Sequence, residues 1–128
     1  MIILKKLQDS LLIPLGGTVY GLIEILWRGH THWTMLLLGG FCFYILAQIG
    51  THLQLPLYLT AVPCAYLITG LEFLTGCVVN LFLGWNVWDY SAQPLNLLGQ
   101  ICLPYLGYWY LLSIPALIIA RNLKAKLT

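Results

Sequence analysis

Charged side chains are scarce in this chain, which has 128 residues, 8% of them charged and 60% hydrophobic. Soluble domains carry roughly 25% charged residues, and a single core in a chain this short does not bury so much apolar surface. A soluble globular domain is therefore excluded, and the mean hydropathy of +0.86 indicates an integral membrane protein. At about 20 residues per span, the chain accommodates about four transmembrane helices in one domain, residues 1–128.

Positive charge is nearly absent from the middle of the chain. With four spans, both ends of the chain lie on one side of the membrane, and the positive-inside rule predicts that this side is the cytoplasm. The positive residues are thus topology signals, and no nucleic-acid partner is expected. Five of the six positive side chains lie near the two ends: Lys5, Lys6, Arg121, Lys124 and Lys126.

Several local signatures are also missing. The sequence has no P-loop and is too short for an ATPase domain, so any coupling to ATP requires another subunit. No small-residue cleavage site follows the first apolar run, so we expect a retained span and no cleaved signal peptide. The cysteines form no C-x-x-C pair and lie inside apolar runs, where we interpret them as small buried hydrophobes. They are Cys42, Cys64, Cys77 and Cys102.

Four apolar runs predict an all-α polytopic membrane helical bundle with spans at about 11–27, 33–49, 60–84 and 95–120. The third apolar region, residues 55–83, is longer than one upright span and contains Pro56 and Pro63. It is either one tilted helix or an interfacial piece to about Ala65 followed by a span, and we favour the second. Pro94 suits the first turn of the fourth helix.

Small residues mark a packing face on the first span. Gly17 and Gly21 have the small-x-x-x-small spacing that allows another helix to approach closely. Glu24 lies on the same face, and Arg28 follows it by one turn. We expect this glycine face to serve a homo-oligomer or a larger membrane partner.

Polar residues recur in the third span and in the stretch that follows it. Thr69, Glu72, Gly76 and Asn80 are spaced by three and four, which predicts one polar and small stripe on a helix. Glu72 is the deepest charge, and a charge at mid-membrane costs about 2.5–3.5 kcal/mol, so its retention indicates a partner or a function.

The stretch 85–100 is the longest polar, aromatic-rich interval in the chain. It lies between two spans, so we expect it at or just under the membrane surface. Its aromatic residues are typical of an interfacial belt. The aromatic residues are Trp85, Trp88 and Tyr90, and the other polar candidates are Asp89, Ser91, Asn96 and Gln100.

His30 and His32 lie in a short loop on the predicted non-cytoplasmic face, together with Asp89. An H-x-H spacing is able to bind a metal, but the signal is weak and we expect no metal. A histidine base oriented by Asp89 would suit an enzyme that modifies a lipid, although no nucleophile elbow accompanies Ser91.

Three segments carry a family resemblance. They read E-I-L-W-R-G-H-T-H-W-T-M-L-L-L-G-G at 24–40, L-E-F-L-T-G-C-V-V-N at 71–80 and W-D-Y-S-A-Q-P-L-N-L-L-G-Q-I-C at 88–102. From Tyr20 to Trp109 the chain resembles the CmpB-type family of small membrane proteins described as "Putative ABC-transporter type IV". The resemblance implies a multi-span bundle related to transport in the bacterial cell membrane, without a substrate or mechanism to carry over.

These observations predict a polar pocket open to the non-cytoplasmic face. We expect it to serve a transport or ligand-binding component. The alternatives are an intramembrane enzyme acting on a lipid or lipid-linked substrate at the outer leaflet, and a structural or regulatory subunit. Membrane lipid is an expected partner, and the cofactor, if any, is unknown. The expected ligand-binding residues are Glu24, Arg28, Glu72, Asn80, Asp89, Tyr90, Asn96 and Gln100, with His30, His32 and Asp89 as catalytic candidates.

Overall fold

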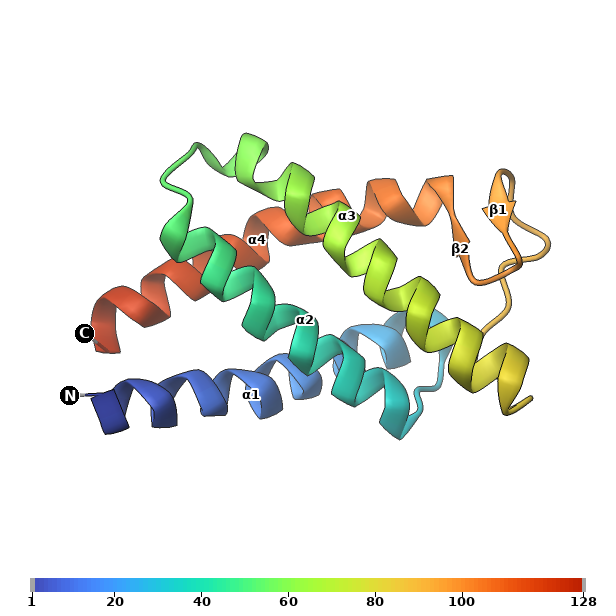
Figure 1. Cartoon of the computed structure of the whole chain (residues 1–128), viewed down its shortest axis with the longest axis horizontal. Helices are drawn as coiled ribbons and strands as arrows, with labels where there is room; N and C mark the ends of the chain where they lie inside the picture. Colours follow the sequence, from blue (N-terminus) through green and yellow to red (C-terminus); the bar gives the residue numbers. More distant parts are fainter. Residues whose placement is uncertain (1, 128) are drawn as a thin grey trace. The chain divides into compact units, whose positions relative to one another are not determined.

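The computed structural model describes the backbone of residues 2–127 and the side chains of residues 10–123. Within it, four helices are long and apolar enough to cross a membrane (Figure 1). The predicted class, an all-α membrane protein with four helical spans, is confirmed. The elements in order are α1 (Ile2–Arg28), α2 (Trp33–His52), α3 (Leu57–Gly76), the π-helix η1 (Cys77–Phe82), β1 (Asn96–Leu97), β2 (Ile101–Cys102) and α4 (Leu103–Leu127).

The chain forms two compact units. Unit 1 comprises Met1–Gln54 and Ala116–Thr128, and unit 2 comprises Leu55–Pro115. Helix α4 therefore contributes its first half to unit 2 and its second half to unit 1.

Glycines bring α1 and α2 of unit 1 into direct backbone contact. A Cβ atom on Gly17 would lie 2.6 Å from the carbonyl oxygen of Leu36, and one on Gly40 would clash with the carbonyl oxygen of Ile13. A Cβ atom on Gly21 would clash with the side chain of Leu36. The expected close packing at Gly17 and Gly21 is present, but the neighbour is α2 of the same chain. The glycine face is thus occupied by α2, and a homo-oligomer or a larger membrane partner stays a prediction.

Arg121 joins the second half of α4 to the end of α2. Its Nε donates a hydrogen bond to the carbonyl oxygen of Gly50 at 2.9 Å, and its Nη2 donates to that of Leu53 at 3.0 Å. A cation suits a helix C-terminus, whose last carbonyls have no partner within the helix. Because α1 runs antiparallel to α2, its first turns point toward this same end of unit 1.

Helix α3 and η1 make one continuous helical span, Leu57–Phe82, with Pro63 inside it. The single-helix alternative is therefore the observed one, and the interfacial piece ending near Ala65 is not formed. Membrane helices tolerate an internal proline because neighbouring groups satisfy the backbone carbonyl that it leaves without a donor. The Thr60 hydroxyl donates to the carbonyl oxygen of Pro56 at 3.0 Å and closes the first turn.

Helix α4 begins at Leu103, and its predicted start near residue 95 was wrong. Leu95, Leu98 and Gly99 have φ values of 53°, 55° and 73°, and this left-handed conformation interrupts a right-handed helix. Strands β1 and β2 pair antiparallel across this turn. Pro94 consequently lies in a loop and does not start a helix.

The contact between α1 and α2 yields a stability prediction. We expect Gly17→Ala and Gly40→Ala to lower the free energy of unfolding in detergent by about 1–3 kcal/mol, because the added methyl group meets a backbone carbonyl that has little room to move. Gly70→Ala and Gly107→Ala are matched controls, since a Cβ at either position meets nothing within 4 Å. Thermal unfolding monitored by circular dichroism measures all four variants. Equal melting temperatures in the two pairs would contradict the interface.

Candidate functional site

A buried carboxylate on α3 is the centre of the candidate site. The side chain of Glu72 is among the largest fully buried ones, with the residue 2% exposed. The Tyr90 hydroxyl donates to its Oε2 at 3.0 Å, and the indole Nε1 of Trp109 donates to its Oε1 at 3.3 Å. One donor comes from the loop after η1 and the other from α4, so Glu72 joins three segments of unit 2.

Aromatic rings cover this carboxylate. Tyr90 stacks on Tyr105 with ring centroids 4.5 Å apart, and Tyr105 meets Trp109 edge-on at 6.5 Å. Nearby at the end of β2, burial raises the pKa of the Cys102 thiol, a hydrogen bond with the Tyr105 backbone lowers it, and the charge of Glu72 raises it. The net effect is a pKa above the usual value of a cysteine thiol. The shell around the carboxylate is thus largely aromatic.

Asn80 of η1 and Gln100 form a second polar centre. Asn80 Nδ2 donates to Gln100 Oε1 at 2.7 Å, and Asn80 Oδ1 accepts from the backbone N–H of Val87 at 2.7 Å. Gln100 Nε2 donates to the carbonyl oxygen of Leu98 at 3.0 Å, and the Trp88 indole donates to the Gln100 carbonyl oxygen at 3.0 Å. These two side chains therefore fasten both ends of the loop to η1, and we call this network the loop clasp.

Gly76 makes room for the loop clasp. A Cβ atom here would lie 2.5 Å from Gln100 Oε1 and 2.9 Å from Trp88 Cζ2. Trp88 is buried, as is Tyr90, so the interfacial-belt interpretation was wrong for both, while Trp85 is exposed. The polar stripe predicted on the third span is used to receive the returning loop.

The loop after η1 runs back along the helix that precedes it. The helical rise from Asn80 to Glu72 is about 12 Å at 1.5 Å per residue, so the contacts reach well below the end of the span. Non-helical backbone at such depth is tolerated only where protein buries it, and the clasp provides that cover. The contacts in order are Val87 with Asn80, Trp88 with the Gly76 position and Tyr90 with Glu72.

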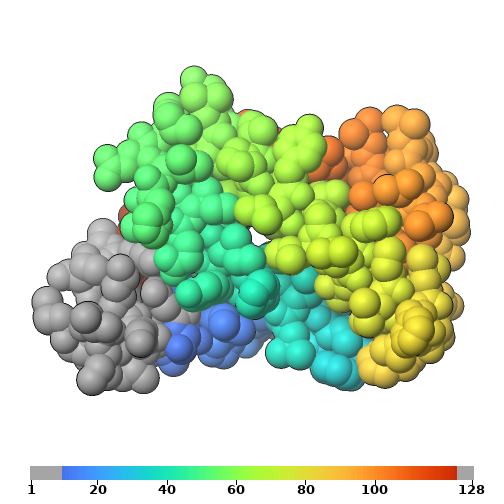
Figure 2. Space-filling model, viewed as in Figure 1, coloured from blue at the N-terminus to red at the C-terminus, as the bar shows by residue number. Residues whose placement is uncertain are grey.

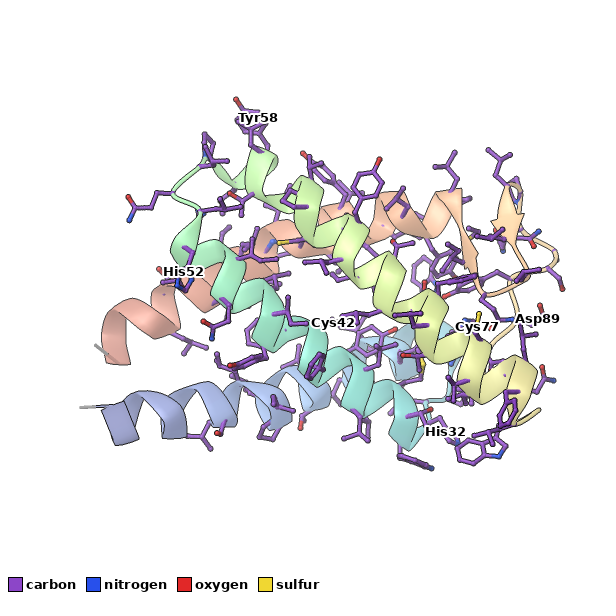
Figure 3. The ribbon with its side chains drawn as sticks, viewed as in Figure 1. His32, Cys42, His52, Tyr58, Cys77 and Asp89 are labelled. Atoms are coloured by element: carbon purple, nitrogen blue, oxygen red, sulfur yellow. The ribbon has the colours of Figure 1, made fainter. Side chains whose placement is uncertain are left out.

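Asp89 and Asn96 shape the outer part of the loop. Asp89 lies at the surface (Figure 3) and accepts a hydrogen bond from the backbone N–H of Ser91 at 2.9 Å. Hydrogen bonds from the Ser91 side chain and backbone lower the pKa of Asp89. Asn96 Nδ2 donates to the Gln93 carbonyl oxygen at 2.9 Å, and its Oδ1 accepts from the N–H of Gly99 at 3.0 Å. Both side chains thus have local turn-forming roles.

The remaining predicted residues belong to unit 1. Arg28 forms an ion pair with the buried Glu24 on α1, with Nε to Oε2 at 3.0 Å and Nη2 to Oε1 at 3.0 Å. His32 is the N-cap of α2: its Nδ1 accepts from the Thr34 N–H at 3.3 Å and lies 2.7 Å from the Thr34 hydroxyl. His30 is exposed.

The predicted pocket therefore draws its residues from both units. A pocket that unites the two sets stays a prediction, as does a histidine base oriented by Asp89. Asn96 and Gln100 were expected within the span from about residue 95, but both precede α4: Asn96 lies in β1 and Gln100 in the loop clasp. Among side chains 10–123, no group of three or more His, Cys, Asp or Glu is arranged to hold a metal. Unit 2 holds Glu72, Asn80, Asp89, Tyr90, Asn96 and Gln100, and unit 1 holds Glu24, Arg28, His30 and His32.

Sequence reasoning missed Trp109 as a partner of Glu72 and Tyr105 as its cover. Both lie in an apolar run where an aromatic residue packs equally well against lipid. The available signal was general: a buried indole N–H needs an acceptor, and Glu72 was the buried acceptor in the adjacent span.

The loop clasp yields a prediction about Asn80. We expect Asn80→Leu to lower the free energy of unfolding by about 1–3 kcal/mol, because it leaves Gln100 and the Val87 N–H without their partner in a part-buried site. The loop should then be cut faster by protease in detergent. The control is Asn122→Leu, at an exposed position on α4. Equal proteolysis of the two variants would show that the clasp does not hold the loop.

Comparison with known proteins agrees with this architecture. A family model described as "Putative ABC-transporter type IV" matches residues 18–127. No solved structure matches the chain. The family match and the four apolar helices identify an integral membrane protein and support the predicted location in a bacterial cell membrane. Because the match covers most of its length, the chain belongs to the CmpB-type family described as "Putative ABC-transporter type IV".

Proposed function

We propose that this protein is a transport or ligand-binding component of a membrane system, in which Glu72 binds a proton or a small cation. The observation that supports the proposal is the burial of the Glu72 carboxylate between the Tyr90 hydroxyl and the Trp109 indole N–H. Both donors are neutral at ordinary pH, so they orient the carboxylate without neutralising its charge. A proton or a small cation bound at this position would neutralise the charge of the carboxylate.

The depth of Glu72 supports the same proposal. It lies ten residues before Phe82, the end of its span, which corresponds to about 15 Å of helix. This is about half the ~30 Å thickness of the hydrocarbon core. Ionisable side chains at such depth are costly and commonly mark ion or proton pathways.

Binding of a proton or a cation at Glu72 is linked to the position of the loop between η1 and α4. The ionised carboxylate accepts from both Tyr90 and Trp109, whereas a protonated or cation-bound carboxyl group has fewer lone pairs for them. Binding at Glu72 therefore weakens the contact that holds the middle of the loop against α3. The loop clasp at Asn80 keeps both ends of the loop in place, while the centre of the loop, at Tyr90, moves when a proton or a cation binds Glu72.

The topology completes the proposal. The first turns of α1 and the end of α4 point toward the same end of unit 1, which agrees with both termini being cytoplasmic under the positive-inside rule. The loop between η1 and α4 would then face the non-cytoplasmic side. Any use of ATP would come from a larger membrane partner or its associated subunit.

Glu72→Gln tests the binding role. In the reconstituted wild-type protein we expect a protonated-carboxyl infrared band that changes as the pH is lowered from alkaline to acidic. We expect Glu72→Gln to remove that band, and Tyr90→Phe to shift it because one hydrogen bond is lost. The Glu24→Gln variant is the control, since Glu24 has its own cation in Arg28.

A band that persists unchanged in Glu72→Gln would overturn the proposal. Loss of one hydrogen-bond acceptor at Glu72 costs about 1–3 kcal/mol, so circular dichroism must show that the variant remains helical. If it unfolds, Tyr90→Phe decides, because this variant keeps the carboxylate: an unshifted band favours a purely structural role for the cluster.

A further inference from the structure

Three large apolar side chains lie exposed at the turn between β1 and β2. Leu95, Leu97 and Leu98 have exposed fractions of 76%, 52% and 63%. We call these residues the leucine tip. In Figure 2 the residues of this loop (orange) and the end of η1 (yellow) lie at the surface along one edge.

The hairpin exposes large apolar side chains while two of its amides are hydrogen-bonded within the protein. Gln100 is buried in the loop clasp, and the exposed Asn96 bonds to the backbone of its own turn. Exposed leucines beside hydrogen-bonded polar groups suit a surface that meets lipid.

The backbone conformation reinforces this pattern. Leu95 and Leu98 have φ values of 53° and 55°, a region that favours glycine or asparagine and is unfavourable for a bulky side chain. In water, a leucine at such a position has both an unfavourable backbone and an exposed apolar side chain. In a lipid environment the contact between the leucine side chain and its surroundings becomes favourable.

The loop clasp sets the depth of the leucine tip. Gln100 lies against Gly76, which precedes Phe82 by six residues and is therefore about 9 Å inside the end of the span. Leu97 is three residues from Gln100, a reach of at most about 10 Å. The tip therefore remains at the level of the last turns of η1 or close to its end.

The neighbouring surface is also apolar. Phe82 at the end of η1 is 85% exposed, and Leu103 at the start of α4 is 53% exposed. Asp89 is the one charged residue between Phe82 and Ala120. The leucine tip thus continues the lipid-facing surface of the two spans that it connects.

We propose that the side chains of the leucine tip insert among lipid acyl chains in the leaflet at this end of the spans, while the backbone of the tip stays at the membrane surface, so that the loop is a lipid-contacting element. This inference does not depend on a proton or cation binding at Glu72. It assigns the outer side of the loop to lipid and its inner side to the polar site, and the same short hairpin connects the two.

Depth-dependent quenching tests the proposal in the full chain. Leu97→Cys and Leu98→Cys are each labelled with an environment-sensitive fluorophore in a Cys77→Ser background, since the other three cysteines are buried. The proteins are reconstituted in phosphatidylcholine vesicles with nitroxide-labelled acyl chains, and iodide is the aqueous quencher. Gln93→Cys is the exposed polar control in the same loop, and Leu111→Cys on α4 is the lipid-facing reference.

Both tip probes should behave like the Leu111→Cys probe, with about twofold stronger nitroxide quenching and about twofold weaker iodide quenching than the Gln93→Cys probe. Quenching by iodide to the level of Gln93→Cys would overturn the proposal by placing the tip in water. Protection from both quenchers would also overturn it, because a second protein copy or another protein would then cover the tip. Leu97→Cys gives the same readout if the left-handed position of Leu98 does not accept the label.

Discussion

The structure of unit 2 depends on the requirement that polar backbone below a membrane surface be fully hydrogen-bonded. The loop between η1 and α4 is not helical, yet it reaches back to the level of Glu72. Asn80 and Gln100 meet the requirement by joining the loop to η1 and by satisfying backbone groups on both sides of it. Without this pair, backbone groups of the loop would lose their hydrogen-bond partners in the apolar layer. Tyr90 would then no longer be held against Glu72.

Two sets of interactions give the units different characters. In unit 1, glycines allow α1 and α2 to meet backbone to backbone, and the ion pair of Glu24 with Arg28 lies within a single helix. In unit 2, the buried carboxylate of Glu72 takes its donors from separate segments. A change at Glu72 therefore affects the contacts of both the loop and α4, whereas the Glu24–Arg28 pair lies within α1. This reach across three segments is the reason for proposing Glu72 as the binding residue.

The sequence predicted the site only in part. The spacing of Thr69, Glu72, Gly76 and Asn80 correctly predicted a shared side of one helix, because helical periodicity is local: Glu72 and Gly76 are buried there, and Asn80 bonds to Gln100. The partners of those groups were not predictable in this way. Trp109 follows Glu72 by 37 residues and Gln100 follows Asn80 by 20, and nothing local to either residue specifies the other. The helix expected from residue 95 is not formed, because Leu95, Leu98 and Gly99 adopt left-handed conformations that the hydropathy pattern does not reveal.

The sequence by itself determined the class of protein: the scarcity of charge, the length of the apolar runs and the placement of lysine and arginine predict a four-span membrane protein. Hydropathy and helical period are properties of residues close together in the sequence, so they can be recognised without the tertiary structure. Only the tertiary structure decided that the polar stretch after the third span folds back against it and brings Tyr90 to Glu72. That outcome depends on shape at Gly76 and on hydrogen bonds between distant residues, which no local pattern encodes.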